Sequence, residues 1–241
     1  MADSPHTEDS PDWQYDEFRQ VGLDFESLNQ VAAYDARQGD LGIYFDKLLD
    51  RLGVKQGHVL IDVGAGTAKL ARAAAARGAE AHAVDISKAM LSHAEASMAS
   101  AGANGVVFHH AGFLSFECQA ETADWVMSFN ALHHLPDFWK QVAIERMASW
   151  LKPGANLVLR DVIFSFDQAN YREGIEHWIS QVAGDGATGW SRADFEAHVR
   201  DEYSTYAWII EGMMARAGFE IVSKDTSLGA YAEYVARKGD K

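Results

Sequence analysis

One stretch, Val59–Ala71 (VLIDVGAGTAKLA), most constrains what this chain can fold into. It begins as a short apolar run with one acid, Asp62, passes through Gly64-Ala65-Gly66 and continues in residues that favour a helix. A buried strand that leads through a glycine turn into a helix can hold a polar ligand, because glycine lets the backbone approach closely and the first helical N–H groups are unpaired. Glycine pairs are also common at strand-to-helix turns that bind nothing. Other parts of the chain must therefore distinguish a ligand site from a purely structural turn.

Composition bounds the class of protein. The 241 residues suffice for one α/β domain with additions, and 21 Lys and Arg against 35 Asp and Glu give a formal net charge of −14. That charge disfavours nucleic acid and anionic membrane surfaces as partners. The single Cys118 cannot form an internal disulfide and matches no zinc spacing, so no metal site and a reducing, cytoplasmic location are expected. The polar N-terminus and the lack of an apolar run of roughly 18 residues predict no membrane span. The oligomeric state stays open.

The chain is expected to divide into a disordered tail (1–11), a helical N-terminal arm (12–52) and one ligand-binding domain (53–241) with an insertion at about 165–206. The arm is rich in aromatic residues and ends in an apolar helical stripe that stops at Gly53. These aromatic side chains either belong to the core or cover a ligand of the first strand, and the sequence leaves both possibilities open.

From Gly57 onward, short apolar runs alternate with helical segments. Five strands are predicted at 58–63, 80–84, 106–110, 124–129 and 155–164, with helices at 67–77, 87–101 and 138–151 and a turn at 152–154. Two final strands, 218–222 and 231–237, are close enough in sequence to pair antiparallel. This alternation predicts an α/β, Rossmann-like, doubly wound sheet of seven mostly parallel strands with an antiparallel last strand. Such sheets bind ligands beyond the carboxyl ends of their strands.

Asp85 indicates what the glycine turn holds. It follows the second predicted strand, about 20 residues beyond the turn, where an acid can accept both hydroxyls of a ribose. A dinucleotide fingerprint would require a third glycine three residues after Gly66, where this chain has Lys69. An acid two residues before the first glycine, Asp62, suits a cofactor that carries an ammonium and a carboxylate. That description fits S-adenosylmethionine.

From about Tyr34 to Arg237, the chain resembles the class I S-adenosylmethionine-dependent methyltransferases. The family's D/E-x-G-x-G-x-G motif matches Asp62–Ala68, with Ala68 in the place of the third glycine, where a helical conformation is expected to need no glycine. Asp124–Leu135 resembles the family's fourth-strand signature, and Leu151–Gly154 resembles its turn into the fifth strand. The correct order and spacing of these motifs make the resemblance specific.

The resemblance implies a set of cofactor-binding residues. They are Tyr34, Asp62, Gly64, Ala65, Gly66, Asp85, Ile86, Gly112, Phe113 and Asn130. The family commonly has an acid after its third strand that faces the adenine amino group. Here the corresponding residues are Ala111-Gly112-Phe113, so the sequence does not assign that role.

The implied reaction is an in-line displacement at the sulfonium methyl by an O, N, S or C nucleophile of a small molecule. The candidate catalytic residues are His133, His134 and Asp161. Histidine is the most usual proton acceptor, and both histidines follow the predicted strand 124–129, while Asp161 is expected to point from the predicted strand 155–164 towards the same rim. Each also has a structural interpretation: packing for a histidine, or a buried pair with Arg160 or Arg37 for Asp161. The alternative functions are a protein or RNA methyltransferase and a non-methylating NAD(P)-binding protein.

Overall fold

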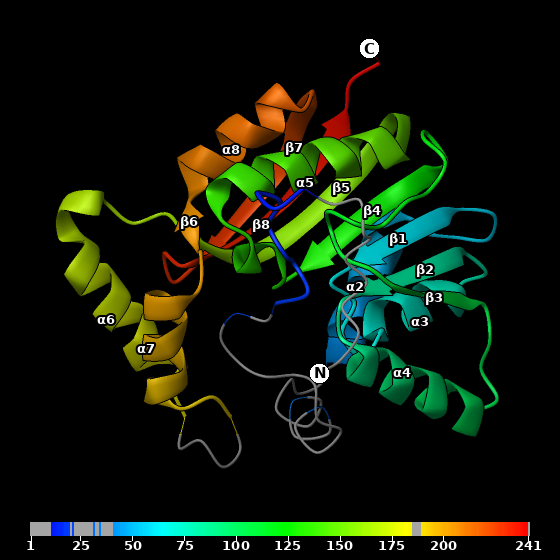
Figure 1. Cartoon of the computed structure of the whole chain (residues 1–241), viewed down its shortest axis with the longest axis horizontal. Coiled ribbons are helices and arrows are strands. Elements are labelled where there is room, and N and C mark those ends of the chain that lie inside the picture. Colours follow the sequence, from blue (N-terminus) through cyan, green and yellow to red (C-terminus); the bar gives the residue numbers. More distant parts are fainter. Residues whose placement is uncertain are drawn as a thin grey trace.

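The computed structural model describes residues 11–19, 21, 31, 34, 41–184 and 189–240. Within these residues the chain forms an eight-stranded sheet in the order β3-β2-β1-β4-β5-β8-β7, with β6 paired to β5 (Figure 1). The strands are β1 Val59–Val63, β2 Glu80–Asp85, β3 Val106–His110, β4 Ala123–Phe129, β5 Leu151–Phe164, β6 Thr205–Tyr206, β7 Phe219–Ser227 and β8 Tyr231–Lys238.

The helices are α2 Leu41–Leu52, α3 Lys69–Ala75, α4 Lys88–Ser100, α5 Asp137–Trp150, α6 Tyr171–Val182, α7 Arg192–Asp201 and α8 Ala207–Arg216, with 3₁₀ turns η1 Leu132–His134 and η2 Gln168–Asn170. Local capping explains where two of them begin. The Ser87 hydroxyl accepts from the Met90 N–H at the start of α4, and Ser191 with Asp194 forms a complete capping box before α7.

The sheet confirms the predicted fold class. Strands β1 to β5 pair in parallel, and β8 lies antiparallel between β5 and β7. The strand order reverses between β1 and β4, because the chain continues outward from β1 through β2 and β3 before it returns to β4 on the other side. A ligand cleft is expected at that reversal, beyond the carboxyl ends of β1 and β4.

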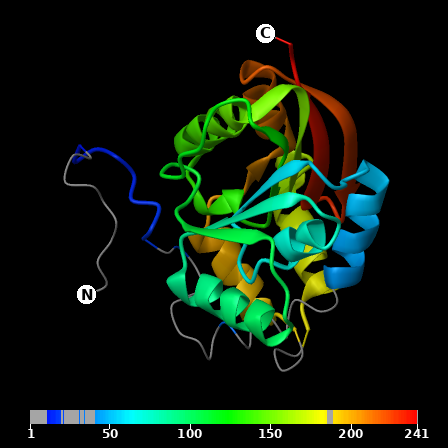
Figure 2. The ribbon, with the colours of Figure 1, turned by 90° about the vertical axis from the view of Figure 1, so that its right-hand side faces the viewer.

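The sheet is covered on both faces, which accounts for its near-continuous apolar strands. Ile61, Val126 and Leu157 belong to one buried cluster together with residues of α5 and α8. Their chain neighbours Leu60, Met127 and Val158 belong to a second cluster with residues of α2 and α3. Figure 2 shows α2 and α5 on opposite sides of the sheet. Successive side chains of a strand point to opposite faces, so both must be apolar when both faces are buried.

The prediction of a helical arm needs correction at its beginning. Residues 11–19 form turns and bends, and helix is present at Val31, at Tyr34 and in α2. The physical reason is that the side chains of Trp13, Tyr15, Glu17 and Phe18 each make a separate contact with the sheet domain. Trp13 stacks on Trp139 with ring centroids 6.4 Å apart, and Phe18 lies 5.3 Å from the ring of His110.

Two smaller expectations are also wrong. Ala68 precedes α3 in the left-handed region (φ 56°), so the position does favour glycine, although the Ala68 methyl group is fully buried. Lys152-Pro153-Gly154 lies within β5 rather than in a turn before it. The pairing with β4 shifts register there, between Ala123 and Trp125, and Gly154 supplies the positive φ (75°) that the irregularity requires.

The segment between β5 and β6 has a small core of its own. Trp178 of α6 is fully buried and packs with Phe164, Ile179 and Ala230. Helices α6 and α7 lie beside each other beyond the end of the sheet (Figure 1). No helix in the described part of the chain combines the length and apolar character needed to cross a membrane.

Candidate functional site

Two adjoining hollows flank the glycine turn between β1 and α3. We call the larger, of about 810 Å³ including its mouth, the Gly64 hollow, and the other the Asp62 hollow. Tyr34, Gly66 and Asn130 line both, which makes them one continuous cleft. All ten residues predicted to bind the cofactor line this cleft. Besides the three shared residues, they are Gly64, Asp85, Ile86, Gly112 and Phe113 in the first hollow and Asp62 and Ala65 in the second.

The two glycines of the turn are needed for different reasons. Gly64 (φ 75°) packs against β4's end, since a Cβ there would lie 2.2 Å from the Ala131 Cβ. Gly66 (φ 54°) has no heavy atom of the described residues within 4 Å of the position that a Cβ would take. Gly64 is therefore required by the packing of the protein itself, whereas the space beside Gly66 belongs to the cleft.

Asp85 connects the glycine turn to the end of β2. Its Oδ2 accepts from the Gly66 N–H at 2.7 Å, and its Oδ1 accepts from the Ser87 N–H at 2.8 Å. Each carboxylate oxygen retains acceptor capacity for a ligand hydroxyl. Burial raises the pKa of Asp85, and the two N–H donors oppose that shift. The carboxyl group is thus held rigidly at the rim of the Gly64 hollow.

Asp62 is the more deeply buried acid. Its side chain is 3% exposed, and Oδ2 accepts a 3.3 Å hydrogen bond from the Ala71 N–H. Burial, with a contribution from Asp85, raises the pKa of Asp62 to about 8. A positively charged ligand group in the Asp62 hollow would favour the ionised carboxylate.

We expect Asp62→Asn to stabilise the ligand-free chain at alkaline pH. The folded chain keeps the Asp62 proton between about pH 4 and pH 8 while the unfolded chain has lost it, so wild-type stability falls as pH rises through that window. The amide cannot ionise and can still accept from Ala71. The stability advantage of the variant should therefore grow by about 4 kcal/mol from pH 5 to pH 9 in urea denaturation. Parallel pH profiles for variant and wild type would contradict the burial of a titrating carboxyl group.

Glu17 is a cleft residue that the sequence analysis missed. Its Oε2 accepts from the Leu114 N–H at 2.9 Å, and it lines the Gly64 hollow. Oε1 is buried without a hydrogen-bond partner among the described residues. Gly112 makes the approach possible, since a Cβ at Gly112 would lie 2.4 Å from Glu17 Oε2. Glu17 places a carboxyl group just after β3, where the acid that is usual in the family is missing. The missing acid indicates that another residue could take its place, but the sequence does not indicate which one.

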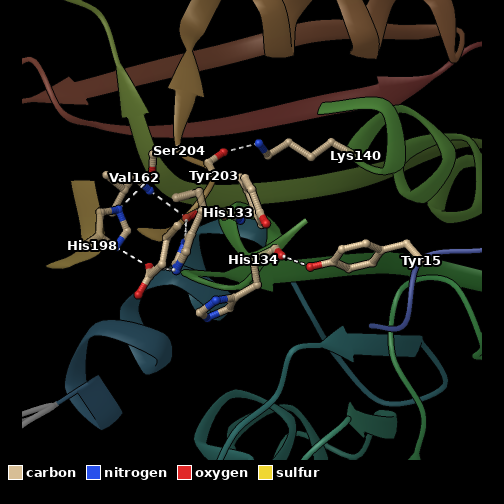
Figure 3. Close-up of polar contacts among 10 residues, drawn as sticks. Tyr15, His133, His134, Lys140, Val162, His198, Tyr203 and Ser204 are labelled. Carbon is tan, nitrogen blue, oxygen red and sulfur yellow. Dashed lines mark hydrogen bonds and ion pairs between the residues drawn. The ribbon is translucent and has the colours of Figure 1, made fainter. Parts of the chain in front are cut away.

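Of the predicted catalytic residues, His133 and His134 lie just beyond the end of β4 (Figure 3), and the buried Asp161 lies in β5, the strand beside β4. The His133 Nδ1 and Asp161 Oδ1 atoms are 2.5 Å apart, and Asp161 Oδ2 accepts from the His133 N–H. Asp161 therefore pairs with His133. Arg160 instead lies over the ring of Tyr44, with its guanidinium carbon 4.9 Å from the ring centroid, and Arg37 lies outside the described residues.

The charges in this cluster distinguish the two adjacent histidines. Burial lowers the pKa of His133, but Asp161 and Glu202 outweigh it and raise that pKa to about 9. Burial and the neighbouring His133 charge lower the pKa of His134 to about 3. At neutral pH, His133 is therefore cationic in the ligand-free chain and His134 is neutral. The buried His134 Nδ1 has no hydrogen-bond partner among the described residues.

A third hollow, which we call the Trp190 hollow, adjoins the cleft. It meets both other hollows at Tyr34 and Asn130, and it meets the Gly64 hollow at His134 as well. Its remaining lining residues are Leu41, His133, Arg160, Val162, Trp190, Asp194, Phe195, His198, Glu202 and Tyr231. Five of these come from the segment between β5 and β6. Asp161 does not line this hollow but lies behind His133.

His198 and Glu202 are site residues that were not predicted from the sequence. Glu202 Oε2 is 3.1 Å from His133 Nε2, and it also contacts His198 Nδ1. The only signal in the sequence is the spacing of four residues, which brings two side chains to one face of a helix. Nothing local indicates that this face meets the end of β4.

The fold and the cleft define a Rossmann-like protein with a ligand-sized cleft at the carboxyl ends of its strands. A family model described as a methyltransferase domain matches residues 60–154. An uncharacterised methyltransferase of Mycobacterium bovis is 31% identical over 141 residues, which are 58% of this chain and 67% of the relative. A second, from Geobacillus kaustophilus, is 26% identical over 189 residues, which are 78% of this chain and 81% of the relative.

Among solved structures, the fold is similar to a magnesium protoporphyrin IX methyltransferase from Synechocystis with bound S-adenosylhomocysteine. The TM-score is 0.61 at 18% identity, covering 92% of this chain and 91% of the other. The chain belongs to the class I S-adenosylmethionine-dependent methyltransferase family. It is a methyltransferase with S-adenosylmethionine as its cofactor, which sets aside the alternative of a non-methylating NAD(P)-binding protein.

Proposed function

We propose that the chain transfers the methyl group of S-adenosylmethionine to a small-molecule acceptor bound in the Trp190 hollow. The observation that carries this proposal is the junction of that hollow with the cofactor cleft at Tyr34, Asn130 and His134. The hollow, of about 1020 Å³ including its mouth, is concave, and its wall combines six aromatic or aliphatic residues with seven polar or charged ones. Concave sites of this kind are typical of small-molecule ligands.

The residues of the cleft fit the cofactor. Two buried side-chain oxygens there, Glu17 Oε1 and Asn130 Oδ1, have no hydrogen-bond partner among the described residues. Buried polar atoms are nearly always paired in native proteins, so these two support a ligand that brings hydrogen-bond donors. In this assignment, Asp85 accepts from the ribose hydroxyls, Glu17 accepts from the adenine amino group, and Gly66 leaves room for the methionyl part. When bound, the cofactor supplies an electrophilic methyl group.

We assign different roles to two of the predicted catalytic residues, His134 and Asp161. His134 is the one that lines both the Gly64 hollow and the Trp190 hollow, and its unpartnered ring nitrogen supports a hydrogen bond from an acceptor O–H or N–H. Asp161 orients His133 through two contacts and acts as a positioning residue. The chain contributes mainly by aligning the acceptor and excluding water, which displacement at a methyl group needs most.

Asp85→Ala should weaken binding of S-adenosylhomocysteine by roughly 1.5–3 kcal/mol, because charge-assisted hydrogen bonds to the ribose are lost. Isothermal titration calorimetry measures this directly. The matched control is Glu80→Ala, an exposed acid at the other end of β2, which should leave the affinity unchanged. Equal affinities of the Asp85→Ala protein and the wild type would refute the ribose assignment.

Glu17→Ala should remove the discrimination between adenine and hypoxanthine. In the wild type, a carboxylate that accepts from the adenine amino group rejects an analogue that presents a carbonyl oxygen at the same place. We expect the wild type to prefer S-adenosylhomocysteine over S-inosylhomocysteine by at least about tenfold, and the variant to bind both alike. Asp85→Ala is the control, since it should weaken both ligands equally. An unchanged preference in the Glu17→Ala protein would show that Glu17 does not face the base.

The acceptor class itself is tested by a screen that measures release of S-adenosylhomocysteine. Pools of small metabolites are compared with peptide pools and with RNA, all at equal cofactor concentration. The proposal expects turnover with one or more small-molecule pools and its loss when Phe195 is changed to Asp, which places a charge in the Trp190 hollow. Turnover confined to peptides or RNA would overturn the small-molecule assignment.

A further inference from the structure

We propose that His133, His198 and Glu202 form a binding site for a divalent transition-metal ion. Each residue offers one ligand atom, and the three atoms all lie within 4.8 Å of one another. The expectation of no metal site came from cysteine spacing in the sequence, which has no bearing on a site whose ligands come from η1 and from the end of α7.

The contacts converge on one oxygen. Glu202 Oε2 is 3.1 Å from His133 Nε2 and also contacts His198 Nδ1. Metal–nitrogen and metal–oxygen bonds of about 2.0–2.2 Å place neighbouring ligands of one ion roughly 3 Å apart. The separation of Glu202 Oε2 from His133 Nε2 matches this spacing, and all three ligand atoms lie within 4.8 Å of one another, close enough for one ion to reach them all.

The second nitrogen of each imidazole is already engaged. His133 Nδ1 is 2.5 Å from Asp161 Oδ1, and His198 Nε2 is 2.7 Å from the Ser204 hydroxyl (Figure 3). Metal-binding histidines almost always have such a partner on the ring nitrogen that does not bind the metal, because it fixes the tautomer and the ring orientation. Here these partners leave His133 Nε2 and His198 Nδ1 directed toward Glu202.

The site is sheltered but not sealed. The side chains of His133, His198 and Glu202 are 8%, 12% and 8% exposed, and all three line the Trp190 hollow. Three protein ligands leave coordination positions open, as in catalytic rather than structural metal sites. With the proposed function, those positions face the space assigned to the acceptor, where an oxygen or nitrogen of the acceptor completes the coordination.

The donor set selects the class of ion. Two imidazoles with one carboxylate suit Zn²⁺, Fe²⁺, Co²⁺ or Mn²⁺. Mg²⁺ prefers oxygen ligands, so it should bind this set poorly. The site therefore predicts discrimination between Zn²⁺ and Mg²⁺ that a merely acidic surface would not show.

The test is calorimetric titration of the full chain with Zn²⁺ and with Mg²⁺ after treatment with a chelator. We expect one equivalent of Zn²⁺ and no comparable Mg²⁺ binding. His198→Gln and Glu202→Gln should each weaken Zn²⁺ binding by more than about 100-fold, and Asp161→Asn by about 10–100-fold, because the carboxylate behind His133 orients that ligand. His177→Gln, which removes an exposed histidine of α6, is the matched control and should bind Zn²⁺ as the wild type does.

A second measurement keeps the proposal falsifiable if a variant fails to fold. Co²⁺ bound by the wild type through histidine nitrogens gives d–d absorption bands that one equivalent of Zn²⁺ should abolish. A wild type that binds no stoichiometric Zn²⁺ or Co²⁺ overturns the proposal, and so do folded His198→Gln and Glu202→Gln proteins with unchanged affinity. Metal binding is measured without acceptor or methyl transfer, so its failure is distinguishable from failure of the proposed function.

Discussion

Gly66→Val is expected to abolish binding of S-adenosylhomocysteine while the sheet stays folded. Gly66 lines both hollows of the cofactor cleft, and no described heavy atom lies within 4 Å of the place a Cβ would take. The valine side chain would therefore enter the space of the ligand rather than clash with the protein. The expected loss of affinity is at least about 100-fold, because the ligand can no longer approach the protein backbone at this position and loses its contact area there.

Backbone strain is the effect that this experiment must separate from ligand exclusion. Valine at a positive φ is strained wherever it is placed. Gly102→Val is the matched control, because Gly102 also has a positive φ (63°) with no described heavy atom within 4 Å, and it follows α4, outside the cleft. Both variants should lose similar stability in thermal unfolding, and only Gly66→Val should lose the ligand in calorimetry. A folded Gly66→Val protein that still binds the ligand would place the cofactor elsewhere.

Deletion of residues 1–21 is expected to remove methyl transfer and to spare folding of the sheet. The described part of this segment covers the cleft side of the domain. Tyr15 donates to the His134 carbonyl at 3.2 Å, and Glu17 lies in the Gly64 hollow. Without these contacts the cleft opens to water, which weakens the alignment of methyl group and acceptor. Turnover should fall below detection, whereas the thermal transition of the sheet persists.

Two comparisons sharpen the deletion experiment. Trp13→Ala in the full chain alters a residue that is 75% exposed and stacks on Trp139, so it should lower turnover far less than the deletion. Glu17→Ala in the full chain separates the loss of one cofactor contact from the loss of the whole cover. Turnover of the truncated protein at the wild-type rate would show that the aromatic residues of this segment serve packing alone.

The fold was predictable because its determinants are local or topological. The apolar runs that become β1, β2 and β4 are separated by helical segments, and parallel βαβ units have one favoured handedness. The glycine turn and Asp85 then fall at the strand ends that meet at the reversal of strand order. The residues that these motifs predict to bind the cofactor can therefore be assigned to one cleft without any knowledge of side-chain packing.

The remaining features depend on contacts between distant parts of the chain. Glu17 reaches the end of β3 through an irregular segment whose path has no periodicity to read. The pairing of Asp161 with His133, and of both histidines with Glu202, depends on how the segment between β5 and β6 folds back. The left-handed conformation of Ala68 could not be predicted either, because alanine rarely adopts a positive φ and its presence does not indicate one.

The most direct test of the account is a crystal structure of the chain with S-adenosylhomocysteine bound. We expect the ribose hydroxyls within hydrogen-bond distance of the Asp85 carboxylate and the adenine amino group facing Glu17. The sulfur atom should lie at the junction marked by Asn130 and His134, directed into the Trp190 hollow. A ligand bound outside the cleft, or a sulfur atom turned away from the Trp190 hollow, would contradict it.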